Sequence, residues 1–307
     1  IYISDIQYIV ICLPLPSVQS SRPSLLVLVN NQMAAIYKNI HPVKYYRDYL
    51  SQDVRPDGRG LLQFRPVSVN VGTLSTAEGS AIVKIGNTMV VCGIKAELCT
   101  PKAEEPDRGF VVANVDLPAL CSSRLRPGPP SDEAQVYSGF MHRLLSSSQL
   151  LDTRQLCICL DRLAWVLYCD FFCLSHEGVV IDACVLALVS ALKTVMLPEV
   201  EYNADTHAIS VNEDVRKPLE LSSFPIATTF AVFDDNILLA DPNEEEERFG
   251  TGVLTVIIQD GKMSSVHKPG GSPMTKEQLE TCFAKAKEHS KHLQQLVNTA
   301  FNSSPER

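Results

Sequence analysis

The chain has 307 residues, of which 45 % are hydrophobic and 20 % are charged, and 27 Lys and Arg against 35 Asp and Glu give a formal net charge of −8. These values are typical of a folded protein with one large or two moderate domains, and they exclude disordered and fibrous architectures. A net negative chain cannot hold nucleic acid by its bulk charge, so an RNA partner would need a local basic surface or one completed by neighbouring subunits.

The ten cysteines lie mostly in apolar stretches such as Cys157-Ile158-Cys159 and Cys169 to Cys173. We interpret them as buried, reduced thiols of an intracellular protein rather than as a disulfide framework. No CxxC motif occurs, and the two cysteines at 169 and 173 have no matching His or Cys pair at zinc-ligand spacing. We therefore expect neither a metal site nor a cofactor.

The first 32 residues differ from the rest of the chain. Ile1 to Gln32 is interrupted by Pro14, Pro16 and Pro23 and is followed by Met33-Ala34-Ala35, which resembles a start of translation. We expect residues 1–32 to be an upstream extension, disordered and outside the fold. A signal peptide or membrane anchor is the alternative, but no basic segment precedes the apolar run and no uninterrupted apolar stretch approaches the ~20 residues of a bilayer span.

Alternating apolar and polar residues predict a sheet in the next part of the chain. From Val67 to Val71, valine alternates with serine and asparagine, which predicts a strand. Two further strands are expected over Ser80 to Ile85 and Thr88 to Leu98. Gly86-Asn87 between these two is a two-residue hairpin signal, because glycine accepts the positive φ that such a turn requires. Val111 to Leu117 is a fourth candidate strand.

A break at Arg126-Pro127-Gly128-Pro129-Pro130 separates these strands from the first predicted helix. Ser131 offers an N-cap, and the two acidic residues after it suit the first helical turn, so we expect a helix to about Ser148. Two buried strands are then predicted, over Leu156 to Cys159 and Ala164 to Leu174.

The second predicted helix, from about Asp182 to Met196, is apolar on nearly every face and is expected to stop at Pro198. A helix of this kind is buried between layers, so we expect it to be the central packing element. Strand signals then return, and a polar helix closes the sequence. The expected elements are the strands Ala208–Val211, Ile226–Phe233, Ile237–Ala240, Gly252–Gln259 and Met263–His267 and the helix Thr275–Asn302.

Two sets of strands, each followed by helix, predict a duplicated α+β domain in which sheets pack on helices. We assign this domain to residues 33–307, with a first β/α half over 33–198 and a second over 199–307. On this pattern alone, an intracellular α+β enzyme unrelated to RNA is one possible function.

Short motifs spread over residues 50 to 300 narrow the choice of protein family. Each motif is weak alone, but together their order and spacing resemble those of the RNase PH family. Three further segments resemble ring subunits of the eukaryotic RNA exosome within that family. The family motifs are Arg55-Pro56-Asp57-Gly58-Arg59, Gly79-Ser80-Ala81 before Gly86-Asn87-Thr88, Gly128-Pro129-Pro130, and Asp241-Pro242 before Glu244-Glu245-Glu246; the further segments are Ser122 to Arg126, Trp165 to Asp170 and His267 to Gly271.

The resemblance implies an RNase PH-like fold, of the ribosomal protein S5 domain 2-like type, in a barrel-like ring of six alternating subunits with RNA threaded through its centre. The implied partners are other RNase PH-type ring subunits, cap subunits and RNA, with no membrane. The implied activity is 3′-to-5′ RNA processing and decay, including ribosomal RNA maturation and turnover of AU-rich messages. The implied location is the nucleus, nucleolus and cytoplasm.

The same resemblance argues against catalysis by this chain. Active members carry an arginine-rich helix ahead of the central strands, whereas His142 to Ser148 holds one arginine, Arg143, where two are expected. Serines cannot replace a guanidinium, because each offers one neutral donor. Active members also place Asp-Gly-Gly before the next helix, and this chain has Glu177-Gly178-Val179. We expect a non-catalytic subunit; the alternative is an active phosphate-dependent 3′-to-5′ exoribonuclease that uses Glu177 and Arg143.

Two acidic features admit both a structural and a chemical interpretation. Asp182 stands at a helix start, where the dipole favours a carboxylate, and we prefer this to a catalytic role. Glu244 to Glu247 could bind magnesium, but a run of like charges more often forms a solvated loop. The Lys268 to Ser272 segment lacks the spacing of a phosphate-binding loop, so we interpret it as a plain turn.

The candidate RNA-binding residues are Arg124, Arg126 and Arg143. The first two lie in a stretch, Leu117 to Pro130, that contains no acidic residue and is broken by proline and glycine. Contact with the RNA backbone is the interpretation we prefer, and solvated surface arginine is the alternative. Arg55 and Arg59 are expected to be structural, because Asp53 and Asp57 lie beside them in the sequence.

Overall fold

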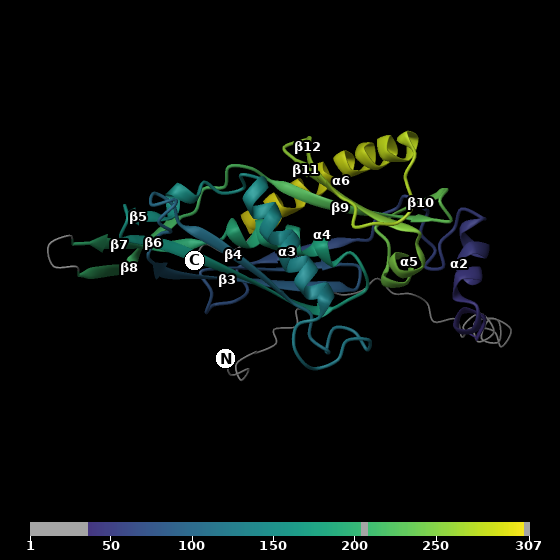
Figure 1. Cartoon of the computed structure of the whole chain (residues 1–307), viewed down its shortest axis with the longest axis horizontal. Helices are drawn as coiled ribbons and strands as arrows, with labels where there is room; N and C mark the ends of the chain where they lie inside the picture. The colour runs from purple at the N-terminus through teal and green to yellow at the C-terminus, as the bar shows by residue number, and fades with distance from the viewer. Residues whose placement is uncertain (1–35, 204–207, 304–307) are drawn as a thin grey trace. The chain divides into compact units, whose positions relative to one another are not determined.

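A computed structural model describes residues 36–203 and 208–303 (Figure 1). The chain divides into two compact units, Ile1–Gln52 and Asp53–Arg307. The first contains helix α2 (Pro42–Leu50), which begins on a proline. The extension predicted over residues 1–32 lies outside the described residues. Within the described ranges, no helix has the length and apolar character needed to cross a bilayer.

The larger unit begins with a six-stranded sheet in the order β1-β2-β3-β6-β4, with β5 pairing beside β6. All pairs are antiparallel except β4 with β6. The predicted hairpin is confirmed: Ile85 pairs with Thr88, and Gly86 between them has a φ of 57°. The strands are β1 (Val67–Val71), β2 (Gly79–Ile85), β3 (Thr88–Cys99), β4 (Phe110–Asp116), β5 (Cys157–Cys159) and β6 (Leu163–Ser175).

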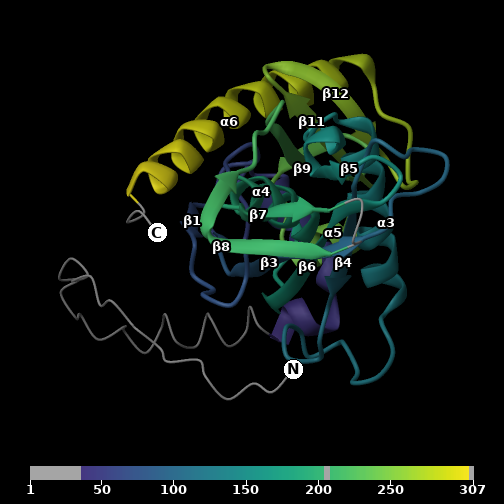
Figure 2. The same ribbon diagram turned by 90° about the vertical axis from the view of Figure 1, so that its left-hand side faces the viewer.

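A four-stranded antiparallel sheet, in the order β10-β9-β11-β12, forms the second half, and helix α6 packs against it and against β1 (Figure 2). Two strands, β7 and β8, form a separate ribbon. The α+β content and the two sets of strands followed by helix are as predicted. The elements are β7 (Met196–Tyr202), β8 (Ile209–Pro218), β9 (Pro225–Phe233), β10 (Ile237–Ala240), β11 (Gly252–Gln259), β12 (Lys262–His267), α3 (Asp132–Ser147), η1 (Thr153–Leu156), α4 (Val180–Leu192), α5 (Glu244–Phe249) and α6 (Lys276–Ser303).

Helix α4 lies between the two sheets, as its all-round apolar sequence predicts. Twelve of its residues are buried, and it contacts β2 and β3 on one side and β9 on the other. The predicted end of this helix is wrong, however. It stops at Leu192, and Pro198 lies inside strand β7, where the pairing with β8 shifts register between Pro198 and Glu199. A proline is tolerated there because a bulge does not require its missing N–H.

Element ends that depend on nearby residues are predicted correctly, whereas those that depend on pairing with a distant strand are not. The Ser131 side chain caps α3 as predicted, accepting a hydrogen bond from the Ala134 N–H at 3.2 Å. Strand β8 runs on to Pro218, well beyond the predicted Val211, because it pairs with the unpredicted β7. The boundary proposed between residues 198 and 199 stays a prediction.

The Glu244–Glu247 run is not a solvated loop: it opens helix α5 with a reciprocal cap. The Asn243 side chain accepts from the Glu246 N–H, and the Glu246 carboxylate accepts from the Asn243 N–H, both at 2.9 Å. Glu246 is fully buried and also forms a two-point ion pair with the fully buried Arg55. Arg55 further donates to the carbonyls of Ala240 at 2.7 Å and Asp241 at 3.0 Å. Arg55 is therefore structural, but its partners lie on β10, on α5 and on the connection between them, and not at the adjacent aspartates.

We predict that Glu246→Ala lowers the free energy of unfolding of the full chain by about 3–5 kcal/mol, because it leaves a buried guanidinium without its counter-charge. Urea denaturation measures the change. Glu280→Ala, at a side chain that is 64 % exposed, is the matched control and should cost less than about 0.5 kcal/mol. A cost for Glu246→Ala as small as that of the control would contradict the assignment.

Candidate functional site

The sequence places Glu177 and Asp182 where β6 gives way to α4, and the structure shows a tight connection there. Gly178 and Val179 both have positive φ, 89° and 48°, and turn the chain into the helix. A Cβ at Gly178 would lie 2.6 Å from the Pro242 carbonyl oxygen, so glycine is required. The start of α4 is thereby held against the connection between β10 and α5.

The N-terminus of α4 is occupied by the protein's own carboxylates. The N–H of Val179 donates to Glu247 Oε1 at 2.8 Å. Asp182, one turn further on, accepts from the N–H and the hydroxyl of Thr229, both at 2.7 Å. Free N–H groups at a helix start are a common binding place for phosphate. Here the Val179 N–H is already bonded to the Glu247 carboxyl group, and the carboxyl group of Asp182 lies close by.

Burial raises the pKa of both of these acids. The pKa of Asp182 rises to about 7, although its hydrogen bonds to Thr229 act in the opposite direction. The pKa of Glu247 rises to about 8, chiefly because of burial and further because of the charges of Asp182 and Asp241, while its bond from Val179 and the charge of Arg65 offset part of the rise. Carboxyl groups that retain protons near neutral pH supply no positive charge for a bound anion, and they repel it once they ionise.

Asp182 is therefore engaged within the protein by Thr229. Glu177 differs, since its side chain is 43 % exposed. Arg65 approaches it, with Nη1 donating to the Glu177 carbonyl at 2.9 Å and lying 3.5 Å from its carboxylate. Arg65 also binds Asp241 through Nη2, at 2.7 Å. Glu177 and Arg65 line a hollow of about 260 Å³ together with Arg59.

Arg143 lines a different hollow, of about 480 Å³, beside β12. His267 from that strand packs its ring on Phe140 at 5.1 Å between centroids, and burial together with the charge of Arg143 lowers the pKa of His267. Ser146 and its neighbour Ser147 donate their hydroxyls to carbonyls of α3 itself. The proposed catalytic pair of Glu177 and Arg143 thus faces two separate spaces.

Arg124 and Arg126 are both exposed on the loop before α3, as expected. Arg124 is nevertheless paired, with Nη1 2.6 Å from Glu244 Oε1 of helix α5. Although this loop itself contains no acidic residue, an acidic side chain of α5 lies beside it. Arg143 stands eleven residues after the start of α3, about 16 Å along the helix, so the three candidate arginines do not form one cluster.

The sequence pattern does not identify two residues of this site. The run of like charges predicts a solvated loop for Glu247, although Asn243 with Glu246 three residues later is the pattern of a capping box and announces a helix. Arg65 belongs to no recognisable sequence motif, and it contacts Asp241 only because the chain folds. Lys268 bonds the carbonyls of Gly270 and Gly271, in keeping with a plain turn. Within residues 36–203 and 208–303, no three His, Cys, Asp or Glu side chains are grouped to hold a metal ion.

Comparison with known proteins covers both halves of the larger unit. Residues 63–198 match the family model described as 3′ exoribonuclease family, domain 1, and residues 223–289 match domain 2. The chain is 41 % identical over 254 residues to exosome complex component rrp43 of Schizosaccharomyces pombe, covering 82 % of this chain and 94 % of that protein. It is 35 % identical over 264 residues to exosome complex component Rrp42 of Pyrococcus furiosus, covering 84 % and 95 %.

Among solved structures, the chain is similar to a subunit of the Archaeoglobus fulgidus exosome with RNA bound to the active site. The TM-score is 0.74 and the identity 27 %, and the match covers 86 % of this chain and 98 % of that one. A match to an archaeal exosome core has a TM-score of 0.71 at 24 % identity and covers 88 % and 99 %, which shows the shared fold.

We predict that the stability of the protein falls as pH rises, and that Glu247→Gln reduces this fall. The pKa of Glu247 is near 4.5 in the unfolded chain and about 8 in the folded one, so the folded state holds the extra proton between these values. Unfolding free energy is therefore lost as pH rises through this window, and a neutral amide avoids the loss.

At pH 9, Glu247→Gln should be more stable than the natural protein by on the order of 1 kcal/mol, whereas at pH 5 the two should be similar. Urea denaturation across this range gives the comparison, with the exposed Glu280→Gln as a control that leaves the profile unchanged. A Glu247→Gln profile parallel to that of the natural protein would exclude Glu247 as the titrating group.

Proposed function

We propose that this chain, which belongs to the RNase PH family of 3′ exoribonucleases, is a non-catalytic ring subunit of an RNA exosome that holds the ring together and lines its RNA path. Its relatives in fission yeast and in Pyrococcus furiosus are named exosome complex components, and the chain covers most of their length. The partners we propose are other RNase PH-type ring subunits, cap subunits and RNA.

The observation that carries this proposal is the carboxylate-filled start of α4. Phosphorolysis must bring inorganic phosphate against an RNA backbone, so its site has to neutralise two anions. Here the Val179 N–H is given to Glu247, and Asp182 and Asp241 add further carboxyl groups around it. Arg65, whose charge acts on Glu247, is bound to Asp241 and to the Glu177 backbone. This arrangement favours a structural subunit over an enzyme.

The alternative, an active phosphate-dependent exoribonuclease, would need Glu177 and Arg143 to act on one substrate. They line separate hollows, which argues against a common reaction centre. The serines beside Arg143 are bonded to the backbone of their own helix and supply no charge.

Assembly into a ring is supported by exposed aromatic residues on the first sheet. Tyr168 and Phe172 lie on β6, one of the interior strands, and are 36 % and 39 % exposed. Their neighbours Leu167 and Phe171 point to the opposite face and are buried in the core with α4, since side chains alternate along a strand. Apolar side chains on an open sheet face suit a protein interface.

The finer parts of the proposal concern the RNA processes that the subunit serves and its location in the cell. We propose that the subunit serves ribosomal RNA maturation and messenger RNA turnover, including AU-rich messages, in the nucleus, nucleolus and cytoplasm. Arg124 and Arg126 are the residues we propose for contact with the RNA backbone. Because the whole chain carries a charge of −8, neighbouring subunits must supply most of the positive charge along the path.

We predict that the full chain, alone or assembled, adds no phosphate-dependent release of nucleoside diphosphates from labelled RNA. The physical reason is that the Val179 N–H at the start of α4 is already bonded to Glu247, and that the carboxyl groups around it supply no positive charge for phosphate. The Glu177→Ala variant should give the same background in the same assay. Phosphate-dependent release that disappears in Glu177→Ala would instead establish the exoribonuclease.

We predict that Arg124→Ala combined with Arg126→Ala weakens RNA retention by the assembled ring several-fold and leaves assembly intact. The plot of log affinity against log salt has a negative slope. For single-stranded RNA, each phosphate that is no longer neutralised by an arginine should make this slope shallower by about 0.7. Arg154→Ala with Arg162→Ala, at two exposed positions elsewhere, is the matched control. Unchanged affinity and slope in the first variant would remove these two arginines from the RNA path.

A further inference from the structure

Two cysteines from separate segments of the chain meet at one end of the first sheet. Strands β4 and β6 run parallel, with Asp116 opposite Phe172 as their last pair, so the chain after β4 continues beside the end of β6. A turn then follows, in which the Cys121 N–H donates to the Pro118 carbonyl at 3.0 Å. This turn places Cys121 next to the last residues of β6, although the two segments are far apart in the sequence.

Both the main chain and a side chain of this end of β6 contact Cys121. The His176 N–H donates to the Cys121 carbonyl at 3.0 Å. Cys173 lies on the core-facing side of β6, and its Sγ is 3.4 Å from the Ser175 carbonyl oxygen, at the same end of the strand. The two cysteines are free thiols in hydrogen-bonding contact with each other. A disulfide requires backbones that already lie close, and this pair meets the requirement in the folded chain.

The two thiols differ in access to solvent and in acidity. Cys121 is 7 % exposed, whereas Cys173 is 1 % exposed. The contact with Cys173 lowers the pKa of Cys121, and burial offsets part of this change. The same contact, together with burial, raises the pKa of Cys173. The more accessible thiol is therefore also the one that ionises more easily, and its buried partner can resolve an oxidised sulfur.

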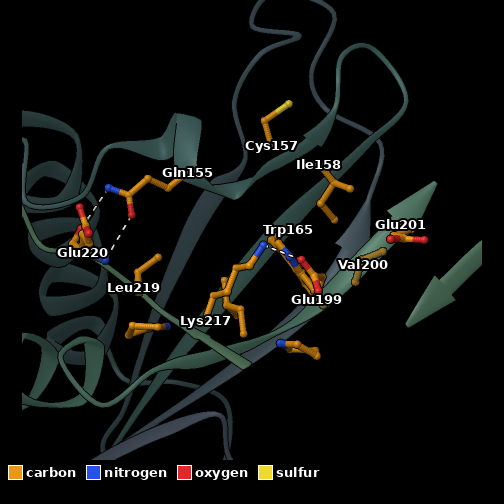
Figure 3. Close-up of a pocket in the computed structure, with 13 residues that line it drawn as sticks. Gln155, Cys157, Ile158, Trp165, Glu199, Val200, Glu201, Lys217, Leu219 and Glu220 are labelled. Carbon is orange, nitrogen blue, oxygen red and sulfur yellow. Dashed lines mark hydrogen bonds and ion pairs between the residues drawn. The ribbon is translucent and has the colours of Figure 1, made fainter. Parts of the chain in front are cut away.

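Exposure alone does not give a cysteine these properties. Cys157 on β5 is more exposed than Cys121 and lines a hollow of about 570 Å³ (Figure 3). Among the residues that line this hollow, there is no second cysteine. Burial and the charges of Asp107 and Cys159 raise the pKa of Cys157. Cys157 is thus a matched comparison, because it is accessible but not made more acidic by its surroundings.

We propose that Cys121 and Cys173 form a reversible disulfide when the protein meets a peroxide, and that this bond ties the loop of residues 117–130 to β6. The Cys121 thiolate attacks one peroxide oxygen, the O–O bond breaks, and Cys121 becomes a sulfenic acid while hydroxide leaves. The proton that Cys121 lost converts the hydroxide to water.

The second step closes the bond. The Cys173 sulfur attacks the Cys121 sulfur and gives up its proton, and the S–O bond breaks with release of a second water molecule. Two thiols and one hydrogen peroxide thus give one disulfide and two waters. A dithiol such as dithiothreitol reverses the change by thiol–disulfide exchange and is itself oxidised.

The bond acts on the loop that carries Arg124 and Arg126. Arg124 follows Cys121 closely and is already paired with Glu244 on α5, so the disulfide holds the loop at a second point, on β6. A loop tied in this way opens less often. The inference goes beyond the proposed function and does not depend on it, because it concerns a covalent bond within this chain and involves neither RNA nor catalysis.

The test uses the full, reduced chain, treated with hydrogen peroxide, denatured in the presence of N-ethylmaleimide and digested with trypsin without reductant. Trypsin cuts after lysine and arginine, so Cys121 falls in a peptide of residues 109–124 and Cys173 in one of residues 163–193. We expect mass spectrometry to show these peptides as one cross-linked species that dithiothreitol separates. The second peptide also contains Cys169 and Cys184, so fragmentation must locate the bond at Cys173.

Three variants and a second readout complete the test. Cys121→Ser and Cys173→Ser should each abolish the cross-linked species, whereas Cys157→Ser should leave its yield unchanged. Oxidation should also slow tryptic cleavage of the folded chain after Arg124 several-fold, and Cys121→Ser should remove this protection.

The cross-link in the natural chain requires no variant, so it is decisive even where a serine variant fails to fold. Absence of the cross-linked species, a bond between Cys173 and Cys184 instead, or a bond that forms only in urea would each overturn the proposal. Cleavage after Arg124 that oxidation leaves unchanged would overturn it as well, because the loop would then not be tied.

Discussion

A guanidinium buried without water must be paired, and the pairing of Arg55 determines how the second half of this protein meets the first. Arg55 holds the carboxylate of Glu246 and the carbonyls that end β10, and so fixes helix α5 in position and orientation. With α5 fixed, the next residue, Glu247, reaches the Val179 N–H at the start of α4. The same connection presents Asp241 to Arg65 and brings the Pro242 carbonyl against Gly178. The start of α4 is thus closed by a structural ion pair that lies outside it.

This arrangement places several carboxyl groups where a phosphorolytic enzyme would need positive charge. Burying an acid is unfavourable unless it is paired or protonated, and the raised pKa values of Asp182 and Glu247 show that protonation supplies part of the compensation. A site under selection to bind phosphate would lose affinity from each such group. A subunit that only maintains a ring can keep them, since their hydrogen bonds to Thr229 and Val179 hold the two halves together.

The parts of the fold that follow from neighbouring residues could be predicted from the sequence. The Gly86-Asn87 hairpin, the Ser131 cap and the buried α4 depend on turn chemistry and periodicity within a few residues. What could not be predicted depends on partners far along the chain. Arg55 and Glu246 are separated by 191 positions and Arg124 and Glu244 by 120, so local charge counts misjudged both arginines. Pro198 suggested a helix end because its bulge against β8 depends on pairing that the local sequence does not reveal.

The distribution of charge differs between the two ends of the larger unit. Arg124 is paired with Glu244 at the start of α5, whereas Glu201 lies on β7, at the opposite end from α5 (Figure 1). Electrostatic attraction between exposed charges acts over about a Debye length, ~8 Å at physiological salt. Charges at opposite ends of a domain therefore act independently on the molecules that approach them. A chain with a net charge of −8 can therefore contribute to an RNA path at one end although acidic side chains lie at the other. The contact with RNA depends on neighbouring subunits, because they must supply most of the positive charge along the path.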